Sequence, residues 1–162
     1  MRRRIFLLGL TALGATTAIA GEGSPAPEAM IRALYELYDP ARRNDGFVPM
    51  DHVDTAIMTT DLAQAYAKVR KAPPGEGAQL DWDLFVNGQD TYDVKNLIVT
   101  SIRTRQGTTV TAKFDNCGSH MVVLYDFVQT DAGWRLGDVR YPPSTDTPPG
   151  HFSLLAFARE PQ

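Results

Sequence analysis

The chain has 162 residues, of which 43% are hydrophobic and 22% are charged, and its formal net charge is -3. This length and composition fit one globular domain with a proper core, and no internal repeat suggests a second. Residues 1–20 hold three of the 16 basic side chains and no acidic one, so the remainder carries 13 basic against 19 acidic groups. A moderately acidic domain without a basic cluster argues against binding to nucleic acid or to an anionic membrane surface.

The first 20 residues, MRRRIFLLGLTALGATTAIA, follow the order of an export signal. Three arginines precede an uncharged run of 16 residues, which is shorter than the roughly 20 residues of a membrane-spanning helix. The run ends in Ala-Ile-Ala, the small-x-small pattern of a signal-peptidase site. Residues 3–7, RRIFL, also resemble the twin-arginine export motif. We therefore expect residues 1–20 to be a cleaved signal peptide and the mature protein to be periplasmic or secreted.

Cys117 is the single cysteine of the chain. No intrachain disulfide can therefore form, and no cysteine follows the cleavage site to carry a lipid. A freely soluble domain, without stable membrane insertion, is expected after cleavage. Cys117 lies in a polar turn, DNCGS, where it is either a small packed residue or a reactive thiol.

The mature chain is expected to begin with a flexible tether, residues 21–27, which is small and rich in proline. A helix follows from Glu28, because apolar residues recur at three- and four-residue spacing until Pro40 ends the pattern. This helix is expected to cover a sheet. Its apolar positions are Met30, Ile31, Ala33, Leu34, Leu37 and Tyr38.

Two more helices are expected in the first half of the chain. Residues 51–58 predict a short helix with His52 exposed in its first turn. A longer helix follows, and either Thr60 or Asp61 can supply its N-cap. Its apolar face consists of Leu62, Ala65, Tyr66 and Val69, and it ends at Pro73-Pro74-Gly75.

Four strands are expected in the second half. Residues 93–104 and 108–115 are rich in Val, Ile and Thr and are joined around Gln106-Gly107. Residues 121–141 predict a hairpin, because two apolar-rich runs flank a Gly-bearing loop, and a closing apolar segment follows at 152–157. Helices followed by a meander of strands predict an α+β fold in a single domain, 28–162, with the helices on one face of a curved antiparallel sheet.

The segment 80–90, LDWDLFVNGQD, combines large apolar residues with three aspartates and has no clean period. We expect a loop that packs its apolar side chains under itself and presents the polar ones. Its spacing does not match a calcium loop, in which the Gly and the terminal Glu have fixed places. The sequence also lacks a nucleophile elbow, a phosphate-binding glycine loop and a dinucleotide fingerprint, so neither a metal nor a cofactor is expected.

Residues 80–90 and residues 133–141, GWRLGDVRY, resemble a family of exported bacterial proteins of unknown function. That family is placed in the nuclear transport factor 2-like (cystatin-like cone) superfamily. Its members have a signal peptide, N-terminal helices, an apolar segment ending in Gln-Asp and a late strand with Gly-Trp-Arg followed by an acid. The resemblance runs from about residue 28 to residue 157 and implies a cone-shaped α+β fold without a particular reaction. Family members are often lipoproteins, and this chain differs in lacking the lipid-bearing cysteine.

Candidate chemistry lies on the predicted hairpin. With a three-residue loop, 131–133, Asp126 lies opposite Asp138, and alternation puts both on one apolar face with His120 and Arg140. Two opposed carboxylates cannot both ionise cheaply there, so one pKa would rise, as a general acid or base requires. Alternatively, Arg140 or Arg103 neutralises the acids, or a loop one residue shorter puts them on opposite faces. The whole predicted face is His120, Val122, Leu124, Asp126, Val128, Trp134, Leu136, Asp138 and Arg140.

Two functions follow as hypotheses. The leading one is a non-catalytic envelope domain that binds a small apolar ligand or another protein through the open end of its cone. The rim of that opening would be Trp82, Asp83, Gln89, Asp90 and Trp134. The alternative is an enzyme of the isomerase, dehydratase or hydrolase type, with Asp126 or Asp138 as proton carrier and His120 or Arg140 stabilising charge. Ketosteroid isomerase and scytalone dehydratase use Asp or His inside the same cone, an analogy of fold alone. A homodimer is left open.

Overall fold

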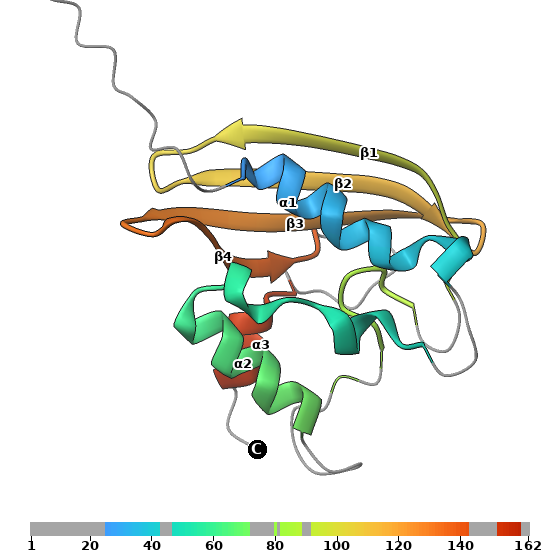
Figure 1. Cartoon of the computed structure of the whole chain (residues 1–162), viewed down its shortest axis with the longest axis horizontal. Helices are drawn as coiled ribbons and strands as arrows, with labels where there is room; N and C mark the ends of the chain where they lie inside the picture. The colour runs from blue at the N-terminus through green and yellow to red at the C-terminus, as the bar shows by residue number, and fades with distance from the viewer. Residues whose placement is uncertain are drawn as a thin grey trace, which may run out of the picture.

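The computed structural model describes residues 25–42, 47–71, 80, 82–88, 92–142 and 152–159. Within these ranges the chain forms α-helices, short 3-10 turns and a four-stranded antiparallel sheet (Figure 1). This arrangement confirms the α+β class. The expected signal peptide, Pro73-Pro74-Gly75, Gln89 and Asp90 all lie outside the described residues.

The sheet is a meander in the order β1-β2-β3-β4. All neighbouring strands pair antiparallel, as the sequence predicts. The strands are β1 (Val94–Arg103), β2 (Thr108–Asn116), β3 (Ser119–Thr130) and β4 (Gly133–Arg140). Cys117 and Gly118 form the turn between β2 and β3 with φ values of 50° and 85°, and two left-handed residues suit a two-residue hairpin. Cys117 is exposed in this turn and is therefore not a packed core residue.

Helix α1 (Pro27–Tyr35) contacts β1 and β2 and lies in front of them in Figure 1. Pro27 occupies the first turn, where its missing N–H has no partner to lose. Pro27 is also buried and begins α1, as its suitability for a first helical turn predicts, whereas residues 21–24 of the expected tether 21–27 lie outside the described residues. Ile31 and Leu34 project from the buried face of the helix. A 3-10 turn, Glu36–Tyr38, continues α1 and buries Tyr38.

The expected short helix at 51–58 is wrong, because two 3-10 turns, Pro49–His52 and Thr55–Ile57, replace it. Between them Asp54 is extended, and its carboxylate accepts a hydrogen bond from the N–H of Ala56 at 2.8 Å. Such a local side-chain bond competes with a continuous helix. His52 is exposed, as expected.

Helix α2 (Thr60–Lys71) confirms the longer predicted helix, but its N-cap is Thr59. The hydroxyl of Thr59 accepts from the N–H of Leu62 at 3.3 Å, which neither Thr60 nor Asp61 does. The closing apolar segment forms helix α3 (Leu154–Arg159), which packs beside α2. In the part of the chain described, no helix is long and apolar enough to cross a membrane.

The two faces of the sheet have different environments. On β3, Val123, Tyr125 and Phe127 are at most 1% exposed, and they join the buried residues of all three helices in one core. The alternate residues of β3 are only half-buried. We call the side of the sheet that they occupy the open face; on β3 it carries Val122, Leu124, Asp126 and Val128.

Candidate functional site

The β3–β4 hairpin places Asp126 opposite Asp138, as the sequence predicts, but through a different register. Its loop has two residues, 131 and 132, and not the expected three. A β-bulge then inserts Gly137 into β4, so that Gly137 and Asp138 together oppose Asp126. The extra residue in the strand offsets the residue missing from the loop. The two carboxylates therefore stay opposite one another despite the shorter loop.

The bulge divides the predicted face of β4. Trp134 and Leu136 precede it and pair with helix-facing residues of β3, and Leu136 is fully buried in the core. Asp138 and Arg140 follow it and pair with residues of the open face. Strict alternation groups all four together, which is wrong because one inserted residue turns every later side chain to the other face. The carboxylates thus lie on the open face and not on the floor of an enclosed cone.

Asp126 is bound by Arg140 in a two-point contact. Nε of Arg140 lies 2.5 Å from one carboxylate oxygen and a terminal nitrogen lies 2.9 Å from the other. Thr109 donates a third hydrogen bond at 2.7 Å. Partial burial alone would raise the pKa of Asp126, but the bonds from Arg140 and Thr109 and the charge of Arg140 hold this pKa below its ordinary value. Asp126 is therefore an ionised partner of Arg140 at neutral pH.

Asp138 holds helix α3 against β4. Its carboxylate accepts from the hydroxyl of Ser153 at 2.6 Å and from the N–H of Leu155 at 3.2 Å. It also accepts from the N–H of Val139 at 2.9 Å. The bond from Leu155 satisfies an N–H group at the start of α3, as an N-cap does. The two opposed aspartates thus have separate partners, and Arg140 neutralises Asp126 as one of the alternatives predicts.

His120 does not join this group. It pairs with Asp115 across β2 and β3, its Nδ1 contacts the Asp115 carboxylate, and its side chain is 93% exposed. The distance along β3 from His120 to Asp126 is about 20 Å at the usual rise per residue. Bonds from Asn96 and His120 lower the pKa of Asp115. The four predicted groups therefore do not converge.

A hollow of about 400 Å³ lies beside the Asp126–Arg140 pair, with the β1–β2 turn as its wall. Gly107 in that turn approaches β3 so closely that a Cβ would lie 1.9 Å from the carbonyl oxygen of Phe127. Only glycine fits there. Thr109 and the ion pair supply the polar lining. Because Asp126 and Arg140 neutralise each other, the charged lining of the hollow is an ion pair and not a free charge.

The predicted rim is wrong at Asp83. Trp82 and Trp134 are half-buried and pack against the core, whereas Gln89 and Asp90 fall outside the described residues. Asp83 was expected at the surface but is only 9% exposed. Asp83 is buried because a hydroxyl and backbone N–H groups inside the domain donate hydrogen bonds to its carboxylate.

The carboxylate of Asp83 lies inside the domain beside a tyrosine. The hydroxyl of Tyr38 is 2.8 Å from both carboxylate oxygens, and the N–H of Phe85 donates at 2.9 Å. Burial raises the pKa of Asp83, and these bonds, with a further one from the N–H of Val86 and the charge of Arg70, only partly counter it. Burial likewise raises the pKa of Tyr38, so this hydroxyl keeps its proton.

Three consecutive carbonyl groups of the loop 82–88 are also satisfied by side chains. The carbonyl oxygens of residues 84, 85 and 86 accept from Tyr141 at 2.6 Å, Tyr35 at 2.8 Å and Asn116 at 3.0 Å. The side chains of residues 84–86 are fully buried, and the ring of Phe85 stacks on that of Tyr125. Sequence reasoning missed these donors. The signal for Tyr35 and Tyr38 was present, because a tyrosine on the apolar face of a helix brings a hydroxyl that needs a buried partner.

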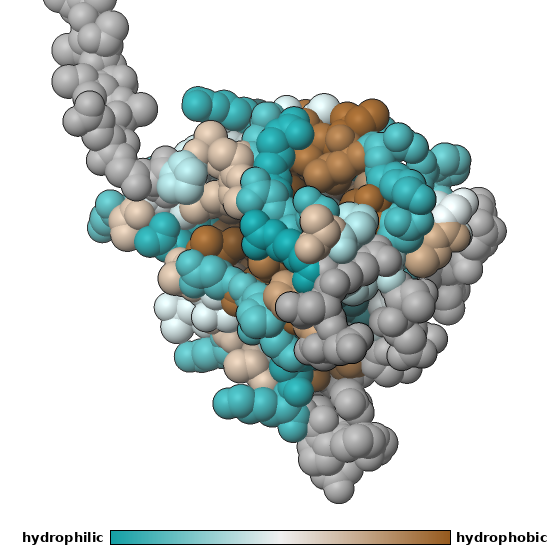
Figure 2. Space-filling view, turned by 45° about the vertical axis from the view of Figure 1, so that its right-hand side comes forward, coloured by the Kyte–Doolittle hydropathy of each residue, from teal (hydrophilic) through white to brown (hydrophobic). Residues whose placement is uncertain are grey.

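The open face has an apolar part along β1 and β3. Ile98 and Ile102 of β1 are 59% and 71% exposed. Through β2 they lie in register with Val122 and Asp126 of β3, and Thr100 lies between them. These exposed branched side chains form an apolar strip on the surface of the sheet. Figure 2 views the molecule from the side on which α1 lies in Figure 1, so it shows apolar surface on the helix side and not the open face.

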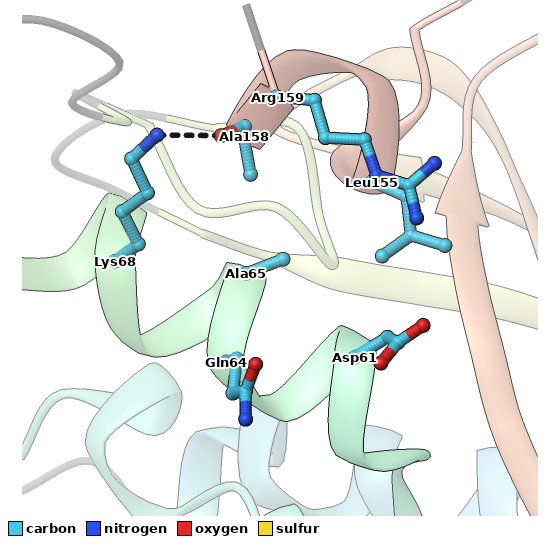
Figure 3. A pocket seen from close by; sticks show the side chains of 7 residues that line it. All are labelled: Asp61, Gln64, Ala65, Lys68, Leu155, Ala158 and Arg159. Atoms are coloured by element: carbon cyan, nitrogen blue, oxygen red, sulfur yellow. Dashed lines mark hydrogen bonds between the residues drawn. The ribbon is translucent and has the colours of Figure 1, made fainter.

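A second hollow, of about 320 Å³, lies between α2 and α3 (Figure 3). Asp61 and Gln64 line it from α2, and Arg159 lines it from α3. Nζ of Lys68 donates to the carbonyl oxygen of Ala158 at 2.6 Å and thereby satisfies the end of α3. The hollow is therefore part of the contact between α2 and α3.

No protein-family model, curated protein or solved structure matches this chain. Among the residues that the structure describes, no three His, Cys, Asp or Glu side chains come together to hold a metal ion. The candidate site is therefore defined by its own geometry: the open face with its apolar strip and the Asp126–Arg140 pair.

Replacing Arg140 by glutamine should raise the pKa of Asp126. Partial burial would then be opposed mainly by Thr109, because the neighbouring positive charge is gone. NMR titration of the carboxyl carbon measures this pKa. Because the pKa of Asp126 is lower in the folded chain than in the unfolded chain, its ion pair stabilises the fold at pH values above the unfolded pKa. This stabilisation is lost as the pH falls through the pKa of the folded chain. Arg135→Gln on the same strand is the control, since Arg135 donates to the backbone of Trp134. An unchanged Asp126 titration in the Arg140 variant would contradict the ion pair.

Asp83→Asn should change how stability depends on pH. The pKa of Asp83 is raised above 3.8 in the folded chain. At a pH between 3.8 and this raised pKa, folded Asp83 holds a proton that the unfolded chain has already lost. The unfolding free energy of the native chain, relative to the variant, should therefore rise as the pH falls through this window. Urea unfolding at several pH values measures the difference, with Asp131→Asn in the exposed hairpin turn as control. A flat difference between the native chain and Asp83→Asn would refute the burial of this carboxylate.

Tyr38→Phe should lower the free energy of unfolding by about 1–3 kcal/mol, because it removes a buried donor to Asp83.

Proposed function

We propose that this chain is an exported, non-catalytic binding module of the cell envelope and that it binds another protein through the open face of its sheet. The observation that carries the proposal is the exposure of Ile98 and Ile102 on β1, on the same face as half-buried Val122 and Leu124 of β3, with β2 between the two strands. The buried residues of every described helix belong to the core on the other side of the sheet. Apolar surface that the fold leaves uncovered is a mark of interaction sites.

A protein partner fits this geometry better than a small ligand. Small-molecule sites are concave and enclose most of the ligand, whereas Ile98 and Ile102 of the apolar strip are 59% and 71% exposed on the surface of the sheet. The interior, where a cone would hold a ligand, is occupied by the fully buried side chains of residues 84–86. On β2, Lys113 lies in register between Ile98 and Val122, and on β4 Arg135 lies opposite Val128. The proposed partner therefore presents apolar side chains interspersed with carboxylates.

We also propose a nuclear transport factor 2-like cone for the fold. The sequence resemblance over residues 80–90 and 133–141 supports it, and so does the order of elements, in which helices precede an antiparallel meander. The helix α1 lying across β1 and β2 is compatible with a sheet that curves around a helical layer.

The enzyme alternative receives no support from the geometry. Asp126 has a lowered pKa, so it is a poor proton donor and a weak base near neutral pH. Asp138 is committed to α3, and His120 lies at the far end of β3. A general acid–base pair needs free groups within reach of one substrate. Asp126 and Asp138 lie opposite one another, but each is bound to a partner of its own, and His120 is remote from both.

Export predicts a specific N-terminus. Protein recovered from the periplasm or the medium should begin at or near Gly21, which mass spectrometry of the intact protein measures, and a retained Met1 would contradict cleavage. If the twin-arginine route is used, the double variant Arg3→Lys, Arg4→Lys should stay in the cytoplasm. The general secretory route would tolerate it, because lysine keeps the charge and loses only the guanidinium group.

Binding through the open face predicts that a charge at its centre weakens the complex. A partner recovered from envelope extract by the native chain should be purified and its affinity measured by calorimetry. Leu124→Lys should weaken that affinity about tenfold or more, because an ammonium group would be buried against an apolar surface. Ala132→Lys, in the exposed hairpin turn, adds the same charge away from the face and should bind as the native chain does.

Equal affinity of the Leu124 variant and the native chain would place binding elsewhere and overturn the open-face proposal. A small apolar ligand that raises the melting temperature, without any protein partner, would favour a ligand-binding function instead.

A further inference from the structure

The outer edge of β1 has no strand beside it in the described part of the chain, because β1 is the first strand of the sheet and pairs with β2 alone (Figure 1). A bare edge can pair with another strand, and proteins guard against this with proline, lysine, charged side chains or bulges. Such devices stand at the two ends of β1: Lys95 and an irregularity at Asn96, whose φ is 54°, at one end, and Arg103 at the other. The stretch from Ile98 to Ile102, IVTSI, contains none.

The direction of the backbone groups can be assigned from two hydrogen bonds. The N–H of Thr104 donates to Gly107 across the β1–β2 turn at 2.9 Å, so the even-numbered positions of this strand direct their backbone groups toward β2. The carbonyl oxygen of Val99 accepts instead from Arg32 of α1 at 3.2 Å. Val99 and Ser101 therefore direct their N–H and C=O groups outward, where a second strand would meet them.

We propose that the chain forms a symmetric homodimer in which two β1 strands pair antiparallel, edge to edge, about a two-fold axis at Thr100. This inference goes beyond the proposed function, because it identifies a second copy of the chain as the partner of the edge. It joins two sheets into one and leaves their open faces free for another protein. Ladder hydrogen bonds then link Val99 of each copy to Ser101 of the other.

The side chains of the open face select this register. With the axis at Thr100, Ile98 of each copy faces Ile102 of the other, and branched apolar pairs directly opposite one another stabilise a sheet. An axis at Val99 or at Ser101 would also align outward backbone groups, but it would set the isoleucines against polar residues. Of the three pairings, only the one about Thr100 brings the exposed isoleucines into contact with one another.

Charges on the helix side of the edge agree with the same register. Arg32 reaches the carbonyl of Val99, and Glu28, one turn earlier in α1, accepts from the hydroxyl of Ser101. Since Val99 of one copy faces Ser101 of the other, Arg32 comes beside Glu28 of the second copy, and symmetry repeats the contact. Opposite charges that meet twice across a two-fold axis favour association and fix orientation. Arg32 need not leave, because the Val99 carbonyl has a second lone pair for the incoming N–H.

Light scattering after gel filtration and sedimentation velocity over a range of concentrations test this proposal. The chain should show a monomer–dimer equilibrium. Ser101→Pro removes an outward N–H without breaking a bond to β2, so it should raise the dimer dissociation constant about tenfold or more. Ser101→Ala is the matched control, since it loses the same hydroxyl and keeps the N–H, and it should stay dimeric. A chain that is monomeric at every concentration, or a dimer that Ser101→Pro leaves intact, would overturn the proposal.

A charge exchange tests the register and does not depend on the proline variant folding. Ile98→Lys and Ile102→Glu should each weaken the dimer, because each sets an unpaired charge against an isoleucine at both symmetry-related contacts. The double variant should regain most of the association, since its opposite charges face each other twice across the axis. A double variant that is no more dimeric than the single variants would refute the axis at Thr100. Recovery that disappears at high salt would support it.

Discussion

The fold depends on the hydrogen bonds that satisfy the backbone of loop 82–88 inside the core. A buried carbonyl without a partner costs about 1–3 kcal/mol, and this loop would otherwise leave three in succession. Tyr35 comes from α1, Tyr141 follows β4 and Asn116 ends β2. Because the donors belong to different elements, the loop becomes stable in the interior only when helix and sheet have assembled around it. The apolar side chains of the loop then complete the core between them.

The carboxylates illustrate how environment divides one residue type into different roles. Asp126 is half-exposed and matched by Arg140, so it remains charged. Asp138 accepts from the start of α3 and thereby joins a helix to a strand. Asp83 is enclosed by Tyr38 and backbone N–H groups, and burial favours its protonated form. Perturbed pKa values often mark catalytic sites, but here each perturbation has a complete structural explanation in groups that hold the fold together.

Much of the architecture follows from the sequence, because helix and strand periodicity are local properties. The apolar spacing before Pro40, the strand pair around Gln106-Gly107 and the later hairpin all correspond to elements of the structure. Alternation shows that β3 has two faces but cannot say which is buried, since Val122 and Leu124 are as apolar as Val123. The bulge does not show in the alternation of apolar and polar residues, and its sign in the sequence is Gly137 itself, because a glycine inside a strand often marks a bulge. The burial of Asp83 depends on Tyr38, 45 positions away, so no reading of the loop alone could find it.

Gly137 has an effect that strand pairing does not reveal. If this one residue were absent, Leu136, Asp138 and Val139 would alternate regularly and could keep their present partners on β3. What would disappear is the bend, with its stronger local twist, that a bulge gives to a strand. The end of β4 would then run straight on and would no longer turn Asp138 toward Ser153. The curvature at this corner of the sheet thus originates in a residue without a side chain.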